Sequence, residues 1–137
     1  MQNLENLVKT GQLKRESGYQ KEFDGLVSSA KKRLVDAKNE SLSIESRFDL
    51  GYNTAHALAL AALRWHGYRS ENRYIVFQCL QHTLGVGPEV WRVLAKCHEL
   101  RNRAEYQGDV DINVKIVNDL ISAIEEVENK VSELGTI

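Results

Sequence analysis

The stretch that decides the fold is AHALALAAL, residues 55–63. Apart from His56 its residues are apolar on every side of a helix, and most of the side chains are small. A helix of this kind is buried, and its neighbours can approach closely. We therefore expect a central helix with neighbours on several sides. It should begin near residue 42, where Ser41 and Ser43 can cap it, and end at Gly67.

Other helices follow from apolar residues spaced three and four apart. The pattern predicts helices over residues 19–37, 73–83 and 88–106, and a final helix whose stripe runs from Val117 to Leu134. Residues 1–16 are more polar and predict a short helix or a loose arm. Together these segments predict an all-α fold, an antiparallel bundle of about five helices, in one domain that spans residues 1–137.

The same spacing assigns individual side chains to buried or exposed faces. It places Tyr19, Tyr74 and Ala104 on apolar faces of their helices. Charged side chains off the stripes are expected to be solvated. This expectation covers Glu22 and also a set of arginines around the Gly67 turn, namely Arg64, Arg69 and Arg73, which could alternatively contact phosphates.

Composition limits the classes of function. The chain has 18 Lys and Arg against 19 Asp and Glu, a net charge of -1, so RNA binding would need a local basic patch. Cys79 and Cys97 form neither a disulfide framework nor a zinc motif, and His82 and His98 lack paired ligands at metal spacing. We expect no metal and no cofactor. Without a signal peptide or a membrane-length apolar run, we expect a cytoplasmic protein with no membrane association.

The candidate chemistry lies near the end of the helix that begins at Pro88. Its apolar seam leads to position 101, so Arg101 should face the core or a cleft, where a guanidinium needs a partner. Glu105 lies four residues on, and Asn102 adds an amide. The residues alone leave two interpretations open: a functional site, or a buried ion pair that ties helices together.

Residues 101–106, which read RNRAEY, resemble the start of the HEPN signature, an arginine and asparagine followed by a histidine four to six residues after the arginine. Residues 52–63 are similar to an alanine-rich helix common in that family. The resemblance covers about residues 40–130. It implies a helical bundle that commonly dimerises, and active members cleave RNA without a metal, using the arginine and the histidine at the dimer cleft.

This chain departs from the HEPN signature at the histidine. Glu105, Tyr106 or Gln107 occupies that position, depending on the spacing counted. A tyrosine, with a pKa of about 10, transfers protons less readily at neutral pH than a histidine near 6.5. His56 could act as a substitute base if it faces Arg101, although a histidine among alanines is more often a packed core residue.

The expectation is a HEPN-like, nucleotide- or RNA-associated helical module, of a prokaryotic defence or toxin-antitoxin system. Its candidate site is Arg101, Asn102, Glu105 and Tyr106, with His56 as a weaker member. Its expected partners are a second copy in a homodimer, RNA or a nucleotide, and a partner protein. Two alternatives stay open: an active metal-independent ribonuclease that uses Tyr106 or His56, and a non-catalytic structural interaction protein.

Overall fold

The computed structural model describes residues 2–108 and 111–137, and of Tyr106 and Gln107 it describes the backbone alone. The helices are α1 (Gln2–Lys9), α2 (Gln20–Ala37), α3 (Ile44–Trp65), α4 (Arg73–Gln78), α5 (Leu80–Thr83), α6 (Pro88–Gln107) and α7 (Val114–Ser132). Strands β1 (Lys14–Arg15) and β2 (Tyr68–Arg69) pair antiparallel, with Lys14 opposite Arg69. The predicted all-α bundle is confirmed, and the small strand pair was not predicted. Within the described residues, no helix is both long and apolar enough to cross a membrane.

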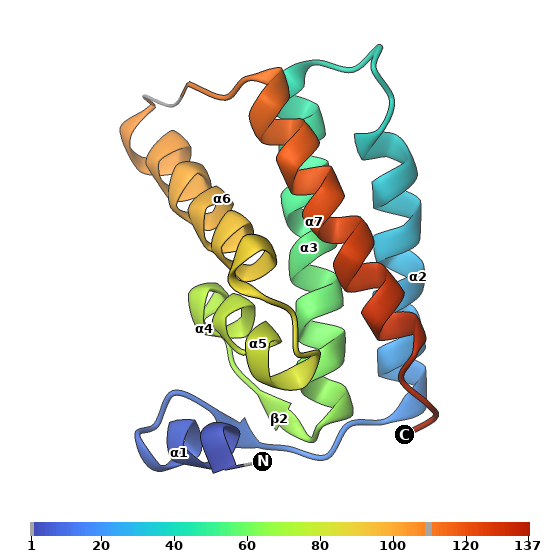
Figure 1. The fold of residues 1–137 in the computed structure, drawn as a ribbon, viewed down its shortest axis with the longest axis vertical. Helices are drawn as coiled ribbons and strands as arrows, with labels where there is room; N and C mark the ends of the chain where they lie inside the picture. The colour runs from blue at the N-terminus through green and yellow to red at the C-terminus, as the bar shows by residue number, and fades with distance from the viewer. Residues whose placement is uncertain (1, 109–110) are drawn as a thin grey trace.

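Helix α3 is the centre of the bundle, as its sequence predicts. It contacts α2, α4, α5, α6, α7 and β2, and Figure 1 shows α2 and α7 running beside it, with α6 leaning against the bundle above α4 and α5. Leu58 and Leu63 on α3 are fully buried. At Gly51 a Cβ would lie 2.9 Å from Leu120 Cδ2 of α7, so the absence of a side chain permits this close approach.

The helix boundaries follow local capping. The Ser43 side chain accepts a hydrogen bond from the Ser46 N–H at 3.1 Å, so the predicted cap of the central helix is confirmed. Gly67, two residues beyond the end of α3, has a φ of 87°, which favours glycine. The predicted helix over residues 73–83 is instead two short helices, because Cys79 ends α4 and begins α5.

Three side chains predicted on apolar faces are exposed. Tyr19 is 58% exposed because it precedes the first turn of α2, where helical spacing does not yet apply. Tyr74 is 42% exposed in the first turn of the six-residue helix α4. Ala104 is exposed because the buried face of α6 continues through Leu100, and Ala104 borders an open pocket.

Residues 2–16 form a docked arm that includes the short helix α1. Leu4 and Leu13 are buried against the rest of the chain. Glu5 bonds both Arg15 and the Tyr68 hydroxyl. The sequence allowed a short helix or a loose arm, and the structure has the helix, held by apolar and ionic contacts.

Arg64, expected to be solvated, is buried at the end of α3. Its guanidinium donates to Glu22 Oε1 at 2.7 Å and to the carbonyl oxygens of Glu16 (2.6 Å), Ser17 (2.9 Å) and Tyr68 (3.2 Å). The prediction was wrong because the segment after β1 crosses the end of α3 and covers the side chain. Glu22 is therefore also partly buried, and the half-buried Arg69 bonds both Glu16 and Glu22.

We predict that Arg64→Met lowers the free energy of unfolding by about 3–5 kcal/mol, because it leaves Glu22 without its buried partner and three carbonyls without a donor. Urea denaturation would measure this change. Arg33→Met is the control, since Arg33 is exposed and bonds only Ser29 among the described residues. Equal stabilities of the two variants would contradict a structural role for Arg64.

Candidate functional site

The candidate site is built around Tyr52, a fully buried tyrosine of α3. Its hydroxyl lies 2.8 Å from His98 Nδ1 of α6, and the two rings stack with centroids 6.1 Å apart. Phe77 of α4 packs edge-on against the Tyr52 ring, with centroids 5.7 Å apart. A buried phenol needs a hydrogen-bond partner, and here the partner is the imidazole. Three helices therefore meet at one aromatic ring.

Two guanidinium groups lie over the Tyr52 ring. The Arg101 Cζ is 4.9 Å from the ring centroid and the Arg73 Cζ is 5.5 Å from it. Arg73 also donates to Asn53 Oδ1 at 3.3 Å. Each cation is attracted by the negative face of the ring, and this attraction strengthens when water is excluded. The fold thus brings two positive charges from α4 and α6 to one point on α3.

Arg101 faces α3, so its predicted inward orientation is confirmed. It bonds Glu105 at 3.3 Å, but the pair lies within α6, and the two side chains are 29% and 52% exposed. Of the two interpretations left open by the sequence, the buried ion pair that ties helices together is therefore wrong. An exposed pair of this kind contributes at most about 1 kcal/mol. The Arg101 Nε is buried and has no hydrogen-bond partner among the described residues.

Asn102 joins the site through His98. Its Nδ2 lies 3.2 Å from His98 Nε2, so both ring nitrogens of this histidine have partners. This role of His98 was not predicted from the sequence, where the residue only lacked the neighbours of a metal ligand. A signal was present, since residues 98, 101 and 102 are three and four apart and share a helix face. The predicted site residue Tyr106 has its side chain outside the described residues.

His56 lies one turn after Tyr52 on α3 and packs edge-on against Phe77, with centroids 6.0 Å apart. Burial, assisted by Arg73, His98 and Arg101, lowers the pKa of His56 to about 4. Burial, with Arg101 and Arg73, also lowers the pKa of His98. Both imidazoles are therefore neutral at pH 7 and able to accept a proton. The role of His56 as a substitute base stays a prediction.

A surface groove opens beside this cluster, between α4 and α6. Its volume is about 710 Å³, and its lining is Tyr74, Arg92, Ala95, Lys96, His98, Glu99 and Asn102. Arg92 and Lys96 are exposed and give the groove two cations, against one carboxylate from Glu99. Tyr74 presents an exposed ring at the same groove. The groove therefore combines positive charge, an aromatic surface and the polar edge of His98 and Asn102.

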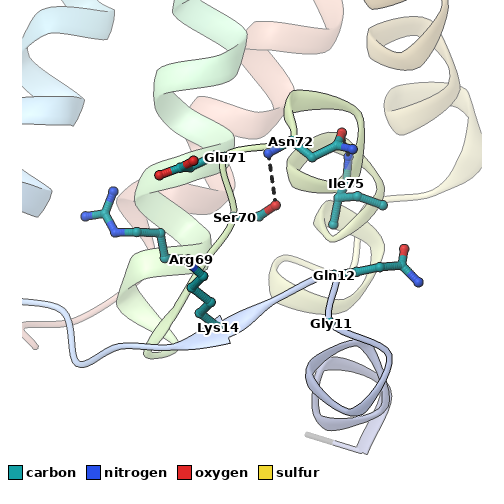
Figure 2. A pocket seen from close by; sticks show the side chains of 8 residues that line it. All are labelled: Gly11, Gln12, Lys14, Arg69, Ser70, Glu71, Asn72 and Ile75. Atoms are coloured by element: carbon teal, nitrogen blue, oxygen red, sulfur yellow. Dashed lines mark hydrogen bonds between the residues drawn. The ribbon is translucent and has the colours of Figure 1, made fainter.

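Two other pockets have less suitable linings. One of about 250 Å³ is lined by Arg101 together with the carboxylates Glu45 and Asp49, so the single cation is outnumbered and the pocket does not favour an anion. Another, of about 320 Å³, lies between the arm and the loop before α4 (Figure 2). In Figure 2 the side chains of Gln12 and Arg69 extend in opposite directions, away from a common centre. The Arg69 guanidinium is already bonded to two carboxylates.

The remaining reactive groups do not form a second site. Burial raises the pKa of the Cys79 and Cys97 thiols to about 12, so both stay protonated and unreactive at neutral pH. Among the described residues, no three His, Cys, Asp or Glu side chains gather closely enough to hold a metal ion.

Comparison of the chain with protein-family models, with curated proteins and with solved structures finds no match. The HEPN resemblance therefore rests on the sequence motifs alone and stays a prediction.

We predict that His56 makes the protein less stable in acid. Its folded pKa of about 4 lies below its ordinary value of 6.5, so the unfolded chain binds more protons between these values and stability falls as pH drops through that range. Between pH 7.5 and pH 5, the titration of His56 should lower the free energy of unfolding by about 2 kcal/mol. Urea denaturation at both pH values would measure it.

The matched variant is His56→Gln, which cannot take up this proton. Its free energy of unfolding should fall less than that of the wild type over the same interval. An equal fall in both proteins would mean that His56 titrates normally and is not desolvated.

Proposed function

We propose that this chain is a nucleotide- or RNA-associated helical module that binds the phosphate backbone along the groove between α4 and α6. The observation that carries the proposal is the pair of exposed cations Arg92 and Lys96 along the groove. Behind them, Arg73 and Arg101 lie over the Tyr52 ring, whose hydroxyl contacts the groove residue His98. The net charge of the chain is close to zero. Arg92 and Lys96, with Glu99 as the one carboxylate in the groove lining, therefore supply the local positive charge that RNA binding requires.

The aromatic lining favours a ligand with bases as well as phosphates. Tyr74 offers a ring on which an unstacked base can lie, and such stacking contributes about 1–3 kcal/mol per base. Asn102 and His98 present hydrogen-bonding groups at the same groove. A simple anion would use the cations alone, whereas a nucleotide would use the cations, the ring and the amide.

We predict that the double variant Arg92→Ala, Lys96→Ala binds a fluorescent ten-nucleotide single-stranded RNA about 10- to 30-fold more weakly than the wild type at 0.1 M salt, because two phosphate contacts are lost. The slope of log affinity against log salt is negative, and its magnitude should decrease by about 1.4. Both side chains are exposed, so the fold should be retained. Fluorescence anisotropy over a salt series would measure both quantities.

The control is Lys31→Ala, Lys32→Ala, which removes the same charge from exposed positions on α2, on the opposite side of α3 from α6 in Figure 1. This variant should bind like the wild type. If both double variants weaken binding equally, the RNA responds to overall charge and the groove is not its site.

A second candidate function is metal-independent RNA cleavage, and the observation that favours it is His98. This histidine lies three residues before Arg101 on the same face of α6, and so brings an imidazole beside the arginine although the signature position lacks one. A neutral imidazole can remove a proton from an attacking hydroxyl, a contribution of about 100- to 10,000-fold to a rate.

Cleavage of RNA by the wild type in a chelator, reduced at least about 100-fold by His98→Ala and by Arg101→Ala, would support this second function. RNA left intact at high protein concentration would exclude it and leave the binding function. Because Arg101 is partly exposed and its ion pair lies within one helix, Arg101→Ala should change the melting temperature little. A large fall would instead support the structural interaction protein.

The expected homodimer and partner protein belong to the same proposal, as does a role in a prokaryotic defence or toxin-antitoxin system. The HEPN resemblance at residues 101–106 supports them. In a dimer of this type the two copies would bring their Arg101 side chains to one cleft. Sedimentation of the purified chain, alone and with RNA, would test the oligomeric state.

A further inference from the structure

The hydrogen bonds of His98 define where its proton lies. Asn102 faces Nε2 with its Nδ2, which can only donate, so Nε2 accepts. A neutral imidazole carries one N–H, which must then be on Nδ1, and this group donates to the Tyr52 hydroxyl oxygen at 2.8 Å. The network thus fits one protonation state of His98, the neutral one.

A proton on Nε2 would oppose this arrangement, because two N–H groups would then point at each other. Turning the Asn102 amide over removes the conflict: Oδ1 accepts from Nε2–H, and Nδ2 moves to the other side of the amide. Asn102 lines the groove beside His98. An amide that has turned over can therefore offer its two N–H donors to an anion in the groove.

The charges around His98 oppose its protonation in the free protein. The titratable and charged groups that face it or share its groove are Tyr52 and His56 from α3, Arg73 and Tyr74 from α4, and Arg92, Lys96, Glu99 and Arg101 from α6. Four of these groups are permanent cations and one is a carboxylate. A bound phosphate would offset the cations and so favour the imidazolium.

We propose that RNA binding in this groove is coupled to the uptake of one proton at His98, with the Asn102 amide turning over to donate to a phosphate. The proposal rests on the proposed function and adds its regulation by pH. By linkage, a proton bound with the ligand makes affinity rise as pH falls. The rise spans the interval between the pKa of His98 in the free protein and its higher pKa in the complex.

The test is isothermal titration calorimetry of the full chain with a ten-nucleotide oligouridine that has hydroxyl ends, whose phosphodiesters stay ionised and whose bases stay neutral between pH 6 and 8. Titrations at pH 7 in two buffers of different ionisation enthalpy count the protons taken up. We expect the wild type to take up about half a proton to one proton, and to bind about tenfold more tightly at pH 6 than at pH 8.

Two histidine variants test whether the proton is taken up at His98 in the groove or at a histidine elsewhere in the molecule. His98→Gln should show no proton uptake from this site, and its affinity should change little with pH. His82→Gln is the matched control, because His82 lies on α5, outside the groove lining, where it contacts Asn3 of the arm. This control should keep the proton uptake of the wild type.

Nitrogen NMR of the wild-type His98 ring gives a measurement that needs no variant. The free ring should show the neutral form with its proton on Nδ1, and the saturated complex should show the imidazolium. Binding with a neutral His98, or equal proton uptake in His98→Gln, would overturn the coupling and leave RNA binding intact. Failure of the oligouridine to bind at any pH would overturn both.

Discussion

Helix α3 is enclosed by its neighbours, so the polar side chains on it must find partners inside the protein. Thr54 donates to the Leu50 carbonyl, and Arg47, from its buried position, donates to the Ala37 carbonyl at 2.9 Å. The Arg64 guanidinium donates to the segment after β1, at Glu16 and Ser17, and to Glu22 of α2. Because a buried polar group without a partner costs about 1–3 kcal/mol, the contacts of Arg47 and Arg64 favour the packing of those particular segments on α3.

The same constraint produces the candidate site. Tyr52 is fully buried, so its hydroxyl needs a partner within the protein, and the imidazole of His98 from α6 is that partner. The Tyr52 ring then becomes a surface for Arg73 and Arg101. The result is a cluster of cations held by packing, beside a groove, with two histidines that are neutral at pH 7. Tyr52 thus has two roles: it is a packed core residue of α3, and it positions the groove residue His98.

The bundle could be predicted from the sequence because helical spacing, caps and breaks are local signals. The site could be predicted only in part. Arg101 and Asn102 share a helix face, which spacing reveals, and His98 could have been added by the same rule. Its partner Tyr52 could not, because it lies 46 residues away in the chain. Arg64 was misjudged for the same reason, since Glu22 is 42 residues from it.

If the groove between α4 and α6 binds the phosphates of RNA, side-chain nitrogen NMR of the arginines during an oligouridine titration tests this most directly. The largest shift should occur at the Nε group of Arg92, which lines the groove, with smaller ones at Arg73 and Arg101, which lie over Tyr52. Shifts concentrated at Arg69 beside the N-terminal arm, or none at any arginine, would contradict it.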